Sequence, residues 1–286
     1  MKEKTPVNPK AKRKKLIIFA VLAVVYLVIL IWGYIMETVK YSVDSDKIDT
    51  PLRVVFISDL HNCFFGGTDQ SALMEEIDKH SPDLVLFGGD VLDFAGGTKF
   101  SLEIMKQASE KYPCCYSPGN HEMLHDGYYE FREDVQNMGV NVLEGGFVSF
   151  EINSQTINVF GATDDSESVP HNTFITQLDS CIELSEEAEG YNIFLAHQPE
   201  IIDSYLEGNF DLILSGHAHG GQWRIPYILD QGLYAPDQGI RPDYTNGIYY
   251  YSYTAHIISK GLAKPLRMIF IPRIFNRPEF TVIDVE

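Results

Sequence analysis

Five short apolar segments in this chain are each followed at once by residues that bind metals or exchange protons. The segments are residues 52–57, 83–87, 114–116, 191–196 and 211–214. Their length and their β-branched and aromatic content predict buried strands. Ligands of open α/β sheets bind beyond the carboxyl ends of the strands. Five such ends in one chain predict a single site at a common sheet edge, and we interpret it as a dinuclear metal site.

The candidate residues stand directly after the predicted strands. In chain order they are Asp59, His61, Asp90, Asp93, Asn120, His121, Glu122, His197, His217 and His219. Residues two apart on extended backbone point the same way, so His217 and His219 are expected to face one site together. The glycines beside them allow a sharp bend and close approach of a ligand. The alternative is that such histidines only form hydrogen bonds within the protein.

The motifs D-x-H, G-D-x-x-D, G-N-H-E, a single His and G-H-x-H occur in this order from residue 52 onward. In this order they resemble the calcineurin-like metallophosphoesterases. The segment G-H-A-H-G-G-Q, with the later S-K-G-L and F-N-R-P, is similar to a membrane-associated bacterial subgroup. That subgroup often has Arg where Lys260 stands here, and a Lys point charge binds phosphate differently from an Arg fork. The resemblance implies an α/β fold, a four-layer α/β/β/α sandwich of two mixed sheets.

The resemblance also implies roles for the candidate residues. One metal would be held by Asp59, His61, Asp90 and His219, and a second by Asp90, Asn120, His197 and His217, with Asp90 bridging. Nitrogen and oxygen ligands without thiolate suit Mn, Fe or Zn. A water that bridges the two divalent ions would hydrolyse a phosphate ester. His121 is expected to be the general acid that protonates the leaving oxygen, and its alternative role is to orient the loop.

Several neighbouring residues carry weaker expectations. Glu122, Asp93 and Gln198 are predicted partners for the second nitrogen of the ligand imidazoles. Asp164 and Asp165 are assigned to a solvated turn rather than to substrate contact, and Cys63 to core packing. Trp223 and Tyr227 are candidate pocket walls, whereas the tyrosine-rich segment 249–253 is assigned to a half-buried strand. The four cysteines do not suggest a disulfide framework.

The first 51 residues predict a membrane anchor. Residues 1–15 carry seven Lys or Arg against one Glu, and residues 16–36 are 21 residues without charge. As a helix this segment would be about 32 Å long, enough to cross a hydrocarbon core of about 30 Å. A cleaved signal peptide is the alternative, but its apolar region is usually only about 7–15 residues long. The basic residues place 1–15 in the cytoplasm as a tail, 16–36 as a single-pass signal anchor in the cell membrane, and the rest outside.

Residues 37–51 are polar and are expected to form a tether, and residues 52–286 to form one phosphoesterase domain. Apolar spacing predicts helices at 69–79, 100–108, 128–138 and 173–184. A hairpin is expected at 147–152 and 156–160, and late strands at 247–258, 266–271 and 280–285. These segments alternate as β–α–β units, which is typical of an α/β domain.

The net charge of −18 argues against a nucleic-acid partner, because nucleic-acid binding depends on cationic contacts to phosphate.

The motifs and the anchor together predict a membrane-anchored hydrolase of a phosphodiester or phosphomonoester. The substrate could be lipid-linked, and no protein partner is predicted. One alternative is a hydrolase of a lipid-linked pyrophosphate such as UDP-2,3-diacylglucosamine, which related enzymes cleave on the cytoplasmic side. A second alternative is a metal-binding scaffold without catalysis.

Overall fold

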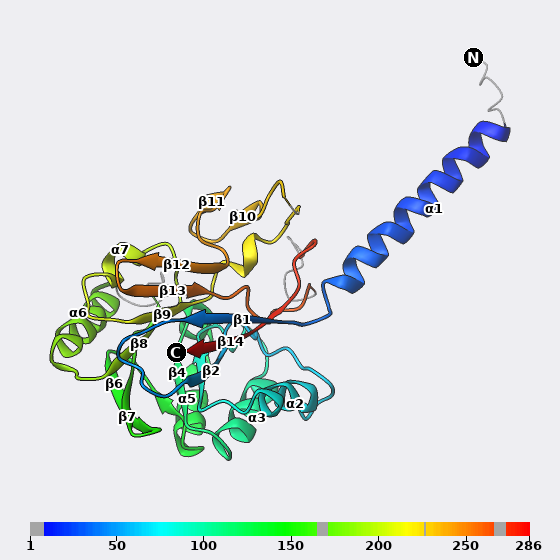
Figure 1. Cartoon of the computed structure of the whole chain (residues 1–286). Helices are drawn as coiled ribbons and strands as arrows, with labels where there is room; N and C mark the ends of the chain where they lie inside the picture. Colours follow the sequence, from blue (N-terminus) through cyan, green and yellow to red (C-terminus); the bar gives the residue numbers. More distant parts are fainter. Residues whose placement is uncertain (1–8, 165–170, 226, 266–272) are drawn as a thin grey trace.

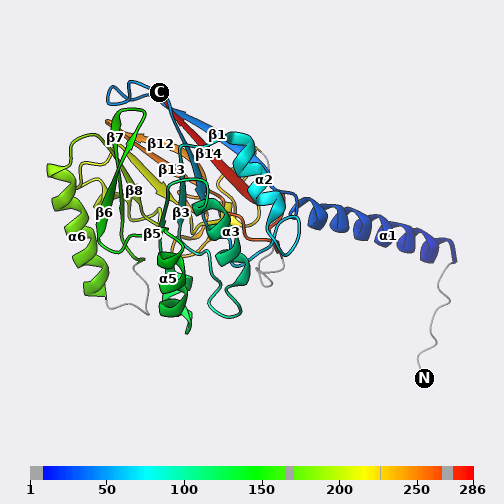
Figure 2. The same cartoon turned by 90° about the horizontal axis from the view of Figure 1, so that it is seen from below.

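Two six-stranded sheets face each other, and helices cover both outer faces (Figures 1 and 2). The computed structural model describes residues 9–164, 171–225, 227–265 and 273–286. The first sheet has the order β1-β14-β2-β3-β4-β5, and the second has the order β12-β13-β9-β8-β7-β6. Each sheet contains both parallel and antiparallel pairs. The predicted α/β fold of two mixed sheets is confirmed.

The elements have the following bounds. The strands of the first sheet are β1 (Glu37–Val43), β2 (Leu52–Ile57), β3 (Leu84–Gly88), β4 (Cys114–Ser117), β5 (Asn141–Val142) and β14 (Glu279–Val285). Those of the second sheet are β6 (Gly146–Ile152), β7 (Gln155–Gly161), β8 (Tyr191–Leu195), β9 (Leu212–Ser215), β12 (Gly247–Tyr251) and β13 (Thr254–Ile258). A separate hairpin consists of β10 (Tyr234–Ala235) and β11 (Gly239–Ile240). The helices are α1 (Pro9–Trp32), α2 (Ser71–His80), α3 (Lys99–Ser109), α4 (Asn120–Leu124), α5 (Tyr128–Asn137), α6 (His171–Glu187), α7 (Ile202–Tyr205) and the 3₁₀ turn η1 (His219–Gly221).

The layers follow from the alternation of side chains along each strand. In β2, Val54 and Phe56 pack between the two sheets, while Val55 and Ile57 pack under helices α2, α3 and α5. The outer face of the second sheet packs against α6 and α7 through a third, aromatic-rich cluster. Both faces of the central strands are therefore buried, which explains why their sequences are almost continuously apolar.

The expected helices at 69–79, 100–108, 128–138 and 173–184 correspond to α2, α3, α5 and α6. The expected hairpin corresponds to β6 and β7, which turn at Asn153 and Ser154 in left-handed backbone. The predicted strand 247–258 is instead two antiparallel strands, β12 and β13, because Ser252 adopts a left-handed conformation with φ of 56°. The predicted strand 266–271 lies outside the described residues.

The prediction of a tether at 37–51 is wrong for its first part. Residues Glu37–Val43 form β1, an edge strand that pairs in parallel with β14 over its whole length. Its alternating exposure, with Val43 buried, shows a strand that covers the sheet edge with one face in solvent. The sequence does not indicate this strand, because an edge strand buries few side chains and therefore lacks a strong apolar pattern.

Helix α1 contains, among the described residues, the one segment long and apolar enough to cross a membrane, at 12–32. It projects away from the sandwich (Figure 1). Its apolar side chains are exposed. The helix starts within the basic tail and stops at Trp32, so residues 33–36 of the predicted span lie outside it. An N-terminal signal sequence passes the same test of length and hydropathy.

Candidate metal centre

The strands that precede the candidate residues all end at one edge of the sandwich. Strands β2, β3 and β4 run parallel in the first sheet, and β8 and β9 run parallel in the second. Their carboxyl ends therefore meet, and the backbone of Gly216 at the end of β9 lies against Asp59 after β2. The structure brings the seven predicted metal ligands together at this edge.

Strained backbone marks the site. Five of the predicted ligands, which are Asp59, His61, Asp90, His217 and His219, have φ between 46° and 63°. Non-glycine residues rarely adopt this left-handed conformation, and such strain clusters at functional sites. The expected extended geometry of the G-H-A-H segment is thus wrong. His217 and His219 do not share one direction but reach two different groups of side chains.

The first group contains Asp59, His61 and His219, whose ligand atoms lie within 4.8 Å of one another. All three residues are buried. The His219 Nδ1 atom lies 3.6 Å from Asp59 Oδ1, and the His61 Nε2 atom lies 3.7 Å from Oδ2 of Asp90. Asp90 therefore stands beside the first group as well as within the second.

The second group contains Asp90, His197 and His217, again within 4.8 Å. The His197 Nε2 atom lies 3.3 Å from Asp90 Oδ2. Asn120, the fourth predicted member, has its Oδ1 atom 3.1 Å from Nδ1 of His217. The position of Asp90 between the groups is the one a bridging carboxylate requires.

The nitrogens that face the two groups fit metal ions. Within the described part of the chain, His61 Nε2, His197 Nε2 and His219 Nδ1 are buried without a hydrogen-bond partner. The other ring nitrogen of His197 donates to the Gly88 carbonyl at 2.8 Å, which leaves a lone pair on Nε2. Buried polar atoms without partners are costly, and bound cations would satisfy them. The imidazole, carboxylate and amide donors suit Mn, Fe or Zn.

His121 lies at the rim of the site with its side chain 22% exposed. Its Nε2 atom is 3.9 Å from Asp90 Oδ2, and its Nδ1 atom is 3.2 Å from Asp93 Oδ1. Burial disfavours the charged imidazolium, but the Asp90 charge and the Asp93 hydrogen bond outweigh it and raise the pKa of His121 to about 9. The ring is therefore set to carry a proton beside the centre.

Glu122 does not partner a ligand imidazole as expected. Its carboxylate accepts hydrogen bonds from the backbone N–H groups of Asp90, Leu92 and Gly119 at 2.7–2.8 Å. Burial is the main reason that its pKa rises to about 7. Glu122 thus ties the loop after β3 to the loop after β4 and fixes the backbone of Asp90. The Gln198 side chain hydrogen-bonds the carboxylate of Asp237. Asp237 is not among the residues that the sequence indicated.

Asp164 corrects another expectation. It is only 3% exposed, not solvated, and neither carboxylate oxygen has a hydrogen-bond partner among the described residues. Burial raises its pKa to about 6, although the nearby His197 and His217 lower it. The signal existed in the sequence, because Asp164 follows the carboxyl end of β7 as the other site residues follow their strands. Asp165 lies outside the described residues.

Asp237 had no sequence signal. It belongs to the turn of the β10–β11 hairpin, outside the motifs, yet its Oδ2 atom lies 2.7 Å from His217 Nε2. Glu200, His217 and Asp237 offer ligand atoms that lie within 4.8 Å of one another. Only the packing of the hairpin against η1 brings it there, through the hydrogen bond from Leu233 N to Gly221 O.

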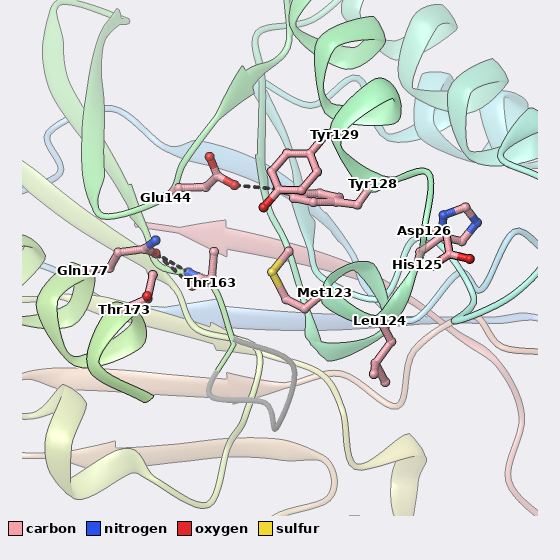
Figure 3. Close-up of a pocket in the computed structure, with 10 residues that line it drawn as sticks. All are labelled: Met123, Leu124, His125, Asp126, Tyr128, Tyr129, Glu144, Thr163, Thr173 and Gln177. Carbon is pink, nitrogen blue, oxygen red and sulfur yellow. Dashed lines mark hydrogen bonds between the residues drawn. The ribbon is translucent and has the colours of Figure 1, made fainter. Parts of the chain in front are cut away.

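The two residues expected to be pocket walls are exposed to solvent. Tyr227 is 96% exposed and Trp223 is 40% exposed. A cavity of about 500 Å³ lies instead beside the chain that follows His121, and neither residue lines it (Figure 3). It is lined by Met123, Leu124, His125, Asp126, Tyr128, Tyr129, Glu144, Thr163, Thr173 and Gln177. One lining residue, Thr163, directly precedes the buried Asp164.

The remaining expectations concern Lys260 and the cysteines. The Lys260 ammonium group pairs with Glu37 and lies 3.4 Å from Glu279, so its charge is occupied by carboxylates of the first sheet. Cys63 is buried as predicted, and none of the four cysteines, all of them in the described residues, forms a disulfide.

Comparison with known proteins agrees with this geometry. The model of the calcineurin-like phosphoesterase domain matches residues 52–221, more than half of the chain. The chain belongs to the calcineurin-like phosphoesterase family.

Relatives from several bacteria extend the similarity beyond that match. The uncharacterized protein YpbG of Bacillus subtilis is 30% identical over 210 residues, which cover 69% of this chain and 74% of YpbG. Phosphodiesterase YaeI of Escherichia coli is 24% identical over 82% of each chain. An uncharacterized metallophosphoesterase of Helicobacter pylori is 29% identical over 78% of this chain, but the match spans only 58% of that longer protein.

Solved structures share the fold. The structure of the protein TT1561 from Thermus thermophilus superposes with a TM-score of 0.51 at 13% identity, covering 76% of this chain and 92% of that one. At this identity the likeness concerns the architecture alone.

Proposed function

We propose that this protein is a membrane-anchored phosphoesterase that uses two divalent metal ions to hydrolyse a phosphate ester. The observation that carries the proposal is the pair of buried donor groups that meet at Asp90 and present three imidazole nitrogens without partners. A scaffold that merely folds around one structural ion would not need two groups joined by a shared carboxylate.

The residues divide by position. Asp59, His61 and His219 would hold one ion, and Asn120, His197 and His217 the other, with Asp90 between them. When bound, the two ions supply positive charge to the phosphate group and activate water for attack. The chain itself supplies the framework, because the carboxylate of Glu122 holds the backbone on both sides of Asp90.

His121 is proposed as the general acid. Its Nε2 atom faces Asp90 at the rim of the centre, where a leaving group can exit. Asp93 holds the Nδ1 side of the ring and keeps the imidazolium charged until it donates its proton. Protonation of the leaving oxygen is typically worth about 10²–10⁴ in rate when that oxygen is a poor leaving group.

The relative named phosphodiesterase YaeI supports a phosphodiester as the first substrate class to test, with a phosphomonoester second. The assay is hydrolysis of bis-p-nitrophenyl phosphate by the full-length chain in detergent with Mn²⁺, Fe²⁺ or Zn²⁺ added. Asp90→Ala serves as the inactive control. If the wild-type chain binds two ions but cleaves no simple ester with any of the metals, the scaffold alternative is favoured.

The anchor and its orientation are also proposed. Helix α1 is long enough to span, and the basic residues before it favour a cytoplasmic N-terminus with the metal centre on the outer side. The four native cysteines are buried, so a single introduced cysteine can show on which side of the membrane its segment lies. Asp46→Cys should react with a membrane-impermeant maleimide in intact cells, and Thr5→Cys only after lysis. The reverse pattern would support the cytoplasmic lipid-linked pyrophosphate alternative.

A further inference from the structure

The proposed anchor joins the domain at the same edge as the metal centre. Strand β1 runs parallel to β14, which runs antiparallel to β2. The start of β1 at Glu37 therefore lies beside the end of β2, where Asp59 and His61 begin the site. Figure 1 shows α1 leaving the sandwich from this side. A helix that spans the membrane would thus bring the catalytic edge, and not the opposite edge, toward the bilayer.

Two adjacent residues connect the end of the anchor to the metal centre. Arg277 donates hydrogen bonds to the carbonyls of Ile35 and Met36 at 2.8 and 2.6 Å, and its guanidinium lies 5.4 Å from the Trp32 ring centroid. Its neighbour Asn276 donates to the His219 carbonyl at 2.7 Å. The distance between helix end and metal centre is therefore fixed by hydrogen bonds, not set by a flexible tether.

Exposed apolar side chains lie on the segments that follow His61 and η1 and on the residue before Asn276. We call Phe64, Trp223, Ile225 and Phe275 the apolar rim, since each is 40–49% exposed. Phe64 follows the His61 loop, and Trp223 follows η1 and forms a backbone bridge with Ile274, the residue before Phe275. A group of exposed apolar side chains at one place marks an interaction surface.

The rim continues directly into the anchor. Beside it, the ammonium group of Lys264 lies 4.5 Å from the centroid of the Phe64 ring. The next residue, Pro265, packs closely against Gly33, the residue that follows α1. At the same level stand Trp32 and Arg277, the residue types that occupy the boundary between hydrocarbon and water in membranes. The occupant that fits this continuity is the lipid bilayer, because α1 places the boundary of that bilayer beside the rim.

We propose that the apolar rim inserts into the headgroup layer and that the metal centre takes its phosphate ester from membrane lipids. This inference rests on the proposed phosphoesterase function and on the anchor. It adds a substrate class, which is a phosphate ester carried by an acyl or alkyl lipid and presented at the bilayer surface. A water-soluble ester would gain nothing from a centre held against the membrane.

Tryptophan fluorescence tests the docking without using activity. The chain has two tryptophans. In full-length Trp32→Phe, reconstituted in phosphatidylcholine nanodiscs, Trp223 is the remaining fluorophore. Brominated phosphatidylcholine should quench it strongly. The matched control is Trp32→Phe, Trp223→Phe with Tyr253→Trp, which places the fluorophore in the β12–β13 turn at the opposite edge and should resist quenching. Equal quenching at both positions, or none at Trp223, would overturn the docking.

Two esters with the same reacting group test the substrate class. The probes are hexadecyl p-nitrophenyl phosphate embedded in the nanodisc and methyl p-nitrophenyl phosphate in solution. Full-length Phe64→Ser with Phe275→Ser should lower the rate on the embedded ester by about tenfold, because insertion of apolar surface is lost. The rate on the soluble ester should stay unchanged. The control pair Tyr250→Ser with Tyr253→Ser, at the opposite edge, should leave both rates unchanged.

The outcomes separate the two proposals. If wild type hydrolyses neither ester, the phosphoesterase proposal fails. If wild type hydrolyses the soluble ester but the rim substitutions do not change the ratio of the two rates, only the lipid inference fails. Quenching of Trp223 that disappears when Phe64→Ser and Phe275→Ser are added would link the docking to these side chains.

Discussion

The imidazole of His217 is held between Asp237 and Asn120. Its Nε2 atom donates a hydrogen bond to Asp237 Oδ2 at 2.7 Å, while its Nδ1 atom faces Asn120 Oδ1 at 3.1 Å. With the proton on Nε2, Nδ1 and the amide oxygen present lone pairs to each other, an arrangement that a cation between them would relieve. A carboxylate on the far nitrogen of a metal-binding histidine fixes its tautomer and raises its basicity.

Removal of this carboxylate should weaken the second metal. Asp237→Ala should lower the affinity of one of the two metal sites by about 10- to 100-fold, and Asp237→Glu should restore part of it. Calorimetric titration of the metal-free protein with Mn²⁺ measures both sites. The matched control is Asp243→Ala, an exposed carboxylate on the segment that follows the β10–β11 hairpin. Two unchanged affinities in Asp237→Ala would mean that the contact has no part in metal binding.

Asp90 should be the residue on which both ions depend. Asp90→Ala should lose both metals together, because its carboxylate lies near His61 of the first group and His197 of the second. His219→Ala should mainly weaken the ion of the first group. Elemental analysis of the purified variants gives the metal content per chain. Two ions per chain in Asp90→Ala would show that the bridging assignment is wrong.

His121 should matter in proportion to how poor the leaving group is. A nitrophenolate leaves without a proton, whereas an alkoxide requires one. His121→Ala should therefore keep its metals and slow alkyl phosphate esters at least about tenfold more than nitrophenyl esters, which corresponds to about 1.4 kcal/mol. His217→Ala should slow both esters similarly through lost metal. The measurement is the rate ratio of the two esters in each variant, and an equal slowing of both by His121→Ala would make His121 a structural residue.

The burial of His256 predicts that the free energy of unfolding depends on pH, independently of the metal centre. It is fully buried on β13, where the Ser215 hydroxyl hydrogen-bonds its Nε2 atom at 2.9 Å, and burial lowers its pKa to about 3. The unfolded chain binds the proton near pH 6.5 and the folded chain does not, so the neutral histidine costs stability as pH falls below 6.5.

The comparison variant is His256→Gln, which keeps an acceptor for Ser215. The free energy of unfolding of wild type relative to this variant should decrease by about 1.4 kcal/mol for each pH unit below 6.5. Urea unfolding of both metal-free proteins between pH 7 and pH 5 measures it. Parallel pH profiles would contradict the burial of a neutral imidazole.

The sequence by itself determined the strands and the residues that follow them. Segments such as 52–57 are apolar at every position but one because both faces of the central strands are buried, and this pattern is readable without a structure. The site residues then follow from position, since parallel strands in one sandwich end at one edge. Asp59, His61, Asp90, His197, His217 and His219 were all placed in this way, and the structure brings them together.

Tertiary structure decided the features that depend on contacts between distant segments. Asp237 reaches His217 only because the β10–β11 hairpin packs on η1, and no local pattern encodes that contact. Glu37–Val43 became a strand because β14 offered an unpaired edge, although the segment is too polar to indicate one. His217 and His219 reach two different groups because both residues adopt a left-handed backbone conformation. The packing around the assembled site holds this strained conformation, and the sequence alone does not reveal it.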